Sequence, residues 1–127
     1  ELGIAGNVRF AGMVDNVYAY FSRSSVFVLS SKREAFGNVL IEALACGAPC
    51  VATRCASGGP QEILADGEYG RLVEIGDVEG IAEAINRTLD VSANGYCLAS
   101  NLVDRSFEFT VARSTSQYSS LLGGLLK

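Results

Sequence analysis

Short apolar runs alternate with amphipathic stretches along this chain. The runs cover residues 8–11, 26–29, 50–53 and 70–75, and the amphipathic stretches cover residues 17–21, 39–46 and 61–65. The runs have the length of strands, whereas the stretches repeat their apolar positions at helical spacing. Alternation of this kind is typical of parallel βα units. We therefore predict an α/β fold in which helices flank a parallel sheet.

The run over residues 26–29 is apolar without a break and consists of Val, Phe, Val and Leu. Strands of parallel sheets carry such runs because helices cover both of their faces. The pattern predicts an interior strand, with the almost wholly apolar helix of residues 38–46 packed on it.

A further helical pattern follows Asp77, which is the expected N-cap. Its apolar positions lie on one face and are Val78, Ile81, Ala82, Ile85 and Leu89. Beyond Asp90 we expect helix and turn, with a break at Asn94-Gly95 and an amphipathic stretch over residues 110–122. This C-terminal part carries no motif.

Length and charge narrow the class of protein. The chain has 127 residues, 49% of them apolar, which fits one domain with a core. Ten Lys and Arg against 14 Asp and Glu give a net charge of −4, which disfavours binding to nucleic acid. No apolar run approaches the ~20 residues of a membrane-spanning helix, and the first residues lack a secretory signal. We expect a cytoplasmic protein, with the full-length protein peripheral at a membrane as the alternative.

The positions of the cysteines and the absence of histidine limit the metal sites and catalytic mechanisms that we expect in this chain. The four cysteines are at positions 46, 50, 55 and 97, and there is no histidine. Their spacing matches no zinc pattern, so we expect reduced core cysteines and no metal. Without histidine, Ser-His-Asp and Cys-His catalysis are excluded within this chain. Acid and base roles would fall to carboxylates.

The loop over residues 30–37 is the most informative segment, because it joins the expected strand at 26–29 to the apolar helix. Ligands of parallel sheets bind at the carboxyl ends of the strands. Gly37 allows close approach of the backbone, and the amides of Asn38 and Val39 would face an anion from the helix N-terminus. These features predict a phosphate-binding site. The alternative is that Gly37 merely begins a helix.

Glu42 is the only charged residue between positions 38 and 46. We expect this helix to be buried nearly all round, and a carboxylate there needs hydrogen-bond donors. The two hydroxyls of a ribose would provide them, and an ion pair with Arg54 or Arg33 is the alternative. Glu34 is expected in the loop before the helix, so the two carboxylates can reach different parts of one extended ligand.

Several segments together resemble the nucleotide-sugar-binding domain of retaining GT-B glycosyltransferases of family 4. The central segment is Glu34-Ala35-Phe36-Gly37 followed by Ile41-Glu42-Ala43-Leu44-Ala45-Cys46-Gly47, with seven residues between the two glutamates. The resemblance covers about residues 8–89 and includes Val8-Arg9-Phe10-Ala11-Gly12, Tyr18-Ala19-Tyr20-Phe21, Gly58-Gly59-Pro60-Gln61-Glu62-Ile63-Leu64 and Asp66-Gly67-Glu68-Tyr69-Gly70-Arg71-Leu72-Val73.

The resemblance implies a Rossmann-like sheet, the C-terminal half of a GT-B fold, and a hexosyltransferase that takes its sugar from a nucleotide diphosphate donor without a metal or other cofactor. By position, Glu34 would be the catalytic carboxylate at the donor sugar, and Glu42 would hold the ribose. The remaining donor-binding residues would be Phe36 at the sugar pocket, Gly37, Asn38 and Val39 at the diphosphate, and Gly12, Met13 and Val14 near the base.

Two departures from the family pattern qualify this expectation. The Arg and Lys that usually grip the diphosphate would precede Glu1, and so would the N-terminal domain that binds a glycan, lipid or small-molecule acceptor. We therefore expect residues 1–127 to form one partial, donor-binding domain that is inactive alone. The alternatives are a non-catalytic GT-B-like assembly module and a fragment of a GT-B sugar-nucleotide epimerase.

Overall fold

The computed structural model of the chain describes residues 2–93 and 99–125. Three strands, β1 (Phe27–Leu29), β2 (Cys50–Thr53) and β3 (Arg71–Val73), form one parallel sheet in the order β1-β2-β3. In its register, Val28 lies opposite Val51, and Ala52 lies opposite Leu72. The α/β fold with a parallel, Rossmann-like sheet is confirmed.

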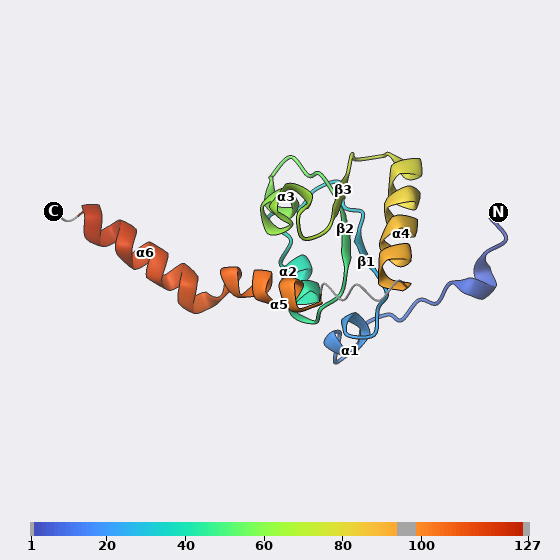
Figure 1. Cartoon of the computed structure of the whole chain (residues 1–127), viewed down its shortest axis with the longest axis horizontal. Helices are drawn as coiled ribbons and strands as arrows, with labels where there is room; N and C mark the ends of the chain where they lie inside the picture. The colour runs from blue at the N-terminus through green and yellow to red at the C-terminus, as the bar shows by residue number, and fades with distance from the viewer. Residues whose placement is uncertain (1, 94–98, 126–127) are drawn as a thin grey trace.

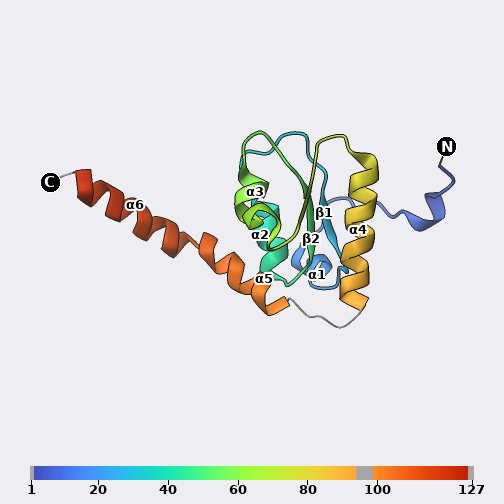
Figure 2. The ribbon, with the colours of Figure 1, turned by 45° about the horizontal axis from the view of Figure 1, so that its top comes forward.

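Helices cover both faces of the sheet (Figures 1 and 2). Helices α2 (Asn38–Ala45) and α3 (Gly59–Ile63) cover one face, with α5 (Ala99–Ser106) packed beside α2, and α4 (Val78–Ala93) covers the other. The smaller elements are η1 (Ala5–Asn7), α1 (Tyr18–Phe21), η2 (Ala65–Gly67) and η3 (Phe107–Phe109). Helix α6 (Val111–Leu125) projects away from the sheet (Figure 1).

The core lies between the sheet and α2, α3 and α5. Leu40, Ala43 and Leu44 of α2 are fully buried, as is Ile63 of α3. Every residue of β2 is buried, and burial raises the pKa of the Cys50 thiol to about 12. Cys50 and Cys55 are buried free thiols, which confirms the expectation of reduced core cysteines for these two. Cys97 lies outside the described residues.

The prediction of an interior strand over residues 26–29 is wrong. The central strand is β2, whereas β1 is at the edge of the sheet and its residues are only half-buried. An unbroken apolar run reports that side chains are covered on both faces of a strand, and it carries no information on how many hydrogen-bonded neighbours the strand has. The expected packing of α2 on the same sheet is nonetheless present.

The strand expected over residues 8–11 is also absent from the described part of the chain. This segment is irregular and exposed, and the Phe10 side chain is 94% accessible. A strand forms only where a neighbour accepts and donates backbone hydrogen bonds. None of the three strands described pairs with this segment.

Two helix predictions are confirmed, and one feature is untested. The Asp77 carboxylate accepts a hydrogen bond from the backbone N–H of Gly80 at 2.8 Å, which is an N-cap at the start of α4. The amphipathic stretch at 110–122 belongs to α6, in which no residue is buried. The Asn94-Gly95 break lies outside the described residues. Among the helices described, none has the length and apolar character needed to cross a bilayer.

Candidate functional site

The loop of residues 30–37 leaves the carboxyl end of β1 and enters α2 at Gly37. Gly37 is the N-cap, with a φ of +100°, a left-handed conformation that favours glycine. No side chain in the described part of the chain caps this helix, so the first-turn amides of Asn38 and Val39 lack a side-chain acceptor. Gly37 thus begins α2 at the carboxyl end of β1, as both the phosphate-binding prediction and its alternative require, and phosphate binding itself stays a prediction.

Strand β2 anchors the beginning of this loop. The buried Thr53 hydroxyl lies 3.3 Å from the carbonyl oxygen of Leu29 and donates a shorter hydrogen bond to the carbonyl oxygen of Ser31. The Cys55 thiol also donates to the Ser31 carbonyl, at 3.3 Å. Two side chains, one from the last residue of the central strand and one just after it, thus fix the path of the backbone where it leaves β1.

Gly59 supports the end of the same loop. A Cβ atom at Gly59 would lie 2.0 Å from the carbonyl oxygen of Phe36 and 2.6 Å from its Cα, so only glycine allows this approach. The preceding Gly58 is the N-cap of α3 with a φ of +78°. The Gly58-Gly59-Pro60 segment is part of the resemblance noted in the sequence, and the contact with Phe36 relates it to the candidate site.

Glu34 lies in the loop, as predicted. It is half-buried, and its carboxylate accepts a hydrogen bond of 2.5 Å from the Ser31 hydroxyl. Since the Ser31 backbone is itself held by Thr53 and Cys55, the Glu34 side chain is tied to the anchored part of the loop.

Glu42 lies on α2 and is half-buried. The expected alternative, an ion pair with Arg54, is wrong: Arg54 pairs instead with Asp66 at 3.4 Å and Glu74 at 3.6 Å. Within the described residues the Glu42 carboxylate has no hydrogen-bond or ion-pair partner, Arg33 included. The carboxylate remains available to donors from a ligand.

Helix α2 is not buried all round, contrary to expectation. Asn38 and Ala45 are exposed, whereas Leu40, Ala43 and Leu44 are buried.

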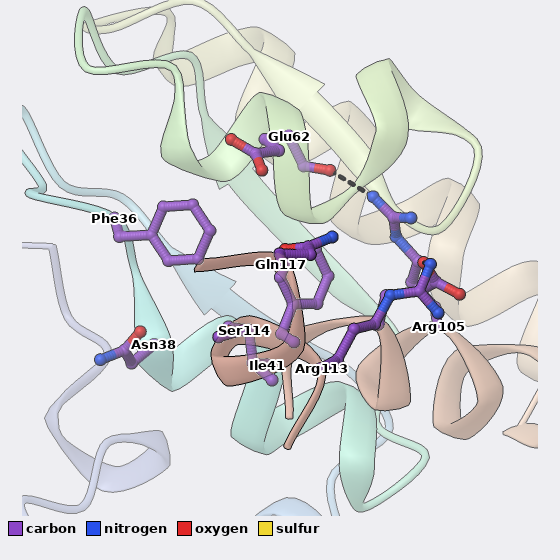
Figure 3. A pocket seen from close by; sticks show the side chains of 10 residues that line it. Phe36, Asn38, Ile41, Glu62, Arg105, Arg113, Ser114 and Gln117 are labelled. Atoms are coloured by element: carbon purple, nitrogen blue, oxygen red, sulfur yellow. Dashed lines mark hydrogen bonds and ion pairs between the residues drawn. The ribbon is translucent and has the colours of Figure 1, made fainter. Parts of the chain in front are cut away.

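A cleft of about 430 Å³ opens beside the N-terminus of α2 (Figure 3). Its lining comes from the loop of residues 30–37 and from α2, α3, η3, α5 and α6, and comprises Phe36, Asn38, Ile41, Glu62, Arg105, Glu108, Phe109, Arg113, Ser114 and Gln117. Of the predicted site residues, only Phe36 and Asn38 line it. Glu42 is one residue beyond Ile41, about 100° further around the helix, and is not part of this lining.

The remaining predicted residues divide into two groups. Gly37 is buried and Val39 is half-buried, so both belong to the turn that begins α2. Gly12 and Met13 lie in the exposed N-terminal segment: nothing is within 4 Å of a Cβ built at Gly12, and the Met13 side chain is fully accessible. Val14 is half-buried. The structure does not pack Gly12 or Met13 against the turn at Gly37.

Side chains from the C-terminal region complete the cleft, and the sequence patterns did not reveal them. The Phe36 and Phe109 rings meet edge to face with centroids 5.9 Å apart. Arg113 forms an ion pair with Glu108 at 2.7 Å. The C-terminal stretch has no motif, and its amphipathic periodicity predicted a helix there but no contribution to the site.

Comparison with known proteins relates this geometry to a family. The family model of glycosyl transferases group 1 matches residues 1–91. A lipopolysaccharide core biosynthesis glycosyltransferase of Rhizobium meliloti is 43% identical over 89% of this chain and 32% of its own length. An N-acetyl-alpha-D-glucosaminyl L-malate synthase of Bacillus anthracis is 43% identical over 65% of this chain and 21% of its own length.

A D-inositol 3-phosphate glycosyltransferase of Acidothermus cellulolyticus is 39% identical over 71% of this chain and 20% of its own length. The chain therefore spans about a third or less of each of these relatives. Because the family model covers residues 1–91, most of the sequence, the chain belongs to the glycosyl transferases group 1 family.

Proposed function

We propose that this chain is the donor-binding part of a retaining glycosyltransferase that takes a hexose from a nucleotide diphosphate sugar and passes it to an acceptor held by another domain. The observation that carries the proposal is the turn at Gly37. It holds a helix N-terminus without a side-chain cap at the carboxyl end of β1, beside a cleft. Family membership supports transfer of a glycosyl group.

The amides of Asn38 and Val39 suit a diphosphate, because N–H groups and the positive end of the α2 dipole attract anions. When the bond between the sugar and the diphosphate breaks, the diphosphate leaves with the electron pair and gains negative charge. Fixed amide donors stabilise that charge more in the transition state than in the ground state. The anchoring of the loop by Thr53, Cys55 and Gly59 keeps these donors in place.

Glu34 would act at the sugar. As the leaving group departs, positive charge develops at the anomeric carbon, and a carboxylate beside it lowers the energy of that state. The hydrogen bond from the Ser31 hydroxyl orients the Glu34 side chain. Glu42, whose carboxylate has no partner in the described part of the chain, would accept hydrogen bonds from the two ribose hydroxyls.

Titration of the chain with UDP, GDP and ADP tests donor binding. We expect weak binding of at least one of them, and we expect Glu42→Gln to weaken it by about tenfold, because a neutral amide is a poorer acceptor for two hydroxyls. Calorimetry or NMR shifts measure the affinity. Glu68→Gln, which changes an exposed carboxylate, is the matched control and should leave it unchanged.

The full-length enzyme tests the role of Glu34. We expect Glu34→Gln to lower kcat by a larger factor than it raises the KM for the donor, since its charge matters most in the transition state. Melting temperatures are measured beside the kinetics. Equal losses of stability in the Glu34 and Glu42 variants, with unchanged kinetics, would contradict both roles. An effect of Glu34→Gln on KM alone would contradict only catalysis.

A further inference from the structure

Arg105 of α5 clamps the C-terminal end of α3. Its Nε donates to the carbonyl oxygen of Ile63 at 3.0 Å, and its Nη2 donates to the carbonyl oxygen of Glu62 (Figure 3). The last carbonyl groups of a helix have no partner within the helix, and a cation there also opposes the negative end of the helix dipole. The guanidinium therefore holds α3 by two charge-assisted hydrogen bonds.

The same guanidinium lies between two aromatic rings. Its central carbon is 5.3 Å from the centroid of Tyr69 and 4.9 Å from that of Phe109, distances at which a cation is attracted to a ring face. Arg105 thereby fixes the ring of Phe109, which lines the cleft next to Phe36. Lysine could not reproduce this, because its ammonium is a point charge without the flat, forked shape of a guanidinium.

Arg105 is connected to Phe36 in two ways, through helix α3 and through the ring of Phe109. Helix α3 has only five residues, and its first residue, Gly59, lies against the Phe36 backbone. The second path runs through Phe109, whose ring meets the Phe36 ring edge to face. One side chain outside the loop thus supports both the backbone and the ring of the residue that precedes Gly37.

We propose that Arg105 is a positioning residue for the anion-binding turn of residues 36–38. The proposal rests on the donor-binding function, because it assigns Arg105 the task of keeping the Asn38 and Val39 amides aimed at the diphosphate. Binding groups must be held to about 0.5 Å by residues that are themselves locked in place. Arg105 supplies this support from α5, although it is 67 positions away from Asn38 in the sequence (105 − 38).

The test replaces Arg105 by Lys and follows the turn directly. The Leu40 amide donates to the Gly37 carbonyl at 2.8 Å and reports on the turn by hydrogen exchange. We expect Arg105→Lys to accelerate its exchange by about tenfold relative to the amides of β2, and to weaken nucleoside diphosphate binding by a similar factor. UDP, GDP and ADP are the probes.

Arg87→Lys is the matched control. Arg87 is on α4, on the opposite face of the sheet, and forms an ion pair with Glu83 one turn earlier. It should change neither the Leu40 exchange nor the affinity. Phe109→Leu removes only the ring contacts with Arg105 and Phe36 and leaves the hydrogen bonds from Arg105 to α3. We therefore expect the exchange of the Leu40 amide to become about threefold faster and nucleoside diphosphate binding about threefold weaker. This variant decides the matter if Arg105→Lys fails to fold.

The outcomes separate the two proposals. A lower melting temperature for Arg105→Lys, with Leu40 exchange unchanged relative to β2 and the affinity unchanged, would overturn the positioning role and leave Arg105 a general stabilising residue. If the unmodified chain binds none of the three probes, the donor-binding function fails, and the exchange of Leu40 still decides whether Arg105 controls the turn.

Discussion

Two glycine turns of this molecule have opposite surroundings. Gly12 directly follows the apolar run at residues 8–11, and Gly37 ends the loop that follows the run at residues 26–29. Both glycines have positive φ angles, +67° and +100° respectively. At Gly37, a Cβ atom would find side-chain carbons of Leu40, Ile63 and Leu29 at 3.6 to 3.8 Å. At Gly12, nothing lies within 4 Å. The same local pattern thus forms part of a packed site at one place and an exposed segment at the other.

Backbone partners explain the difference. The run before Gly37 is β1, which pairs with β2, and the loop after it is held by Thr53, Cys55 and Gly59. The run before Gly12 pairs with none of the described strands, and its large apolar residues Val8 and Phe10 are exposed. Apolar character alone does not order a strand, because the cost of fixing the backbone is repaid only by hydrogen bonds and burial together.

The largest effect should come from Gly59→Ala. A Cβ atom there overlaps the Phe36 backbone, 2.0 Å from its carbonyl oxygen and 2.6 Å from its Cα, so the backbone has to shift. We expect a loss of about 3 kcal/mol or more in the free energy of unfolding, measured by denaturant titration. Gly12→Ala is the control: it meets open space, so only its left-handed backbone contributes, at about 1 kcal/mol. Equal effects of the two substitutions would show that Gly59 does not support the turn.

The sequence predicted the turn well and its supports poorly. The apolar run, the loop that ends at Gly37 and the apolar helix follow one another along the sequence, so their arrangement follows from local pattern. The supporting residues are distant in the sequence: Thr53 ends β2, Cys55 follows it, Gly59 begins α3, and Arg105 lies on α5. Their roles depend on which side chains meet after folding, and no periodicity in one sequence encodes that. The edge position of β1 was missed for the same reason.

A smaller effect is expected from Thr53→Val, which keeps the shape of the side chain and removes its hydroxyl. The carbonyl groups of Leu29 and Ser31 lose a buried donor, although Ser31 keeps the Cys55 thiol. We expect a loss of about 1.5 kcal/mol in the free energy of unfolding. Thr115→Val, at an exposed position of α6, should change it by less than about 0.5 kcal/mol. A Thr53 variant as stable as this control would mean that β2 does not anchor the loop.

The smallest effect is expected from Phe10→Ala in the exposed segment before Gly12. The Phe10 side chain is 94% accessible, so its removal should change the free energy of unfolding by less than about 0.5 kcal/mol. Phe21→Ala is the matched control, because that ring is 5% accessible and meets the Phe27 ring at 5.1 Å. Its loss should cost about 3–5 kcal/mol.

A measurable loss of stability in Phe10→Ala would overturn the contrast between the two glycine turns. It would place Phe10 against the body of the molecule, where the free edge of β1 is the site at which a further parallel strand could pair. Hydrogen exchange at residues 8–11 distinguishes an exposed segment from a strand paired with β1, independently of the free energy of unfolding. Rapid exchange, as in an unfolded peptide, agrees with an exposed segment, whereas protection would restore the strand that the apolar pattern predicts.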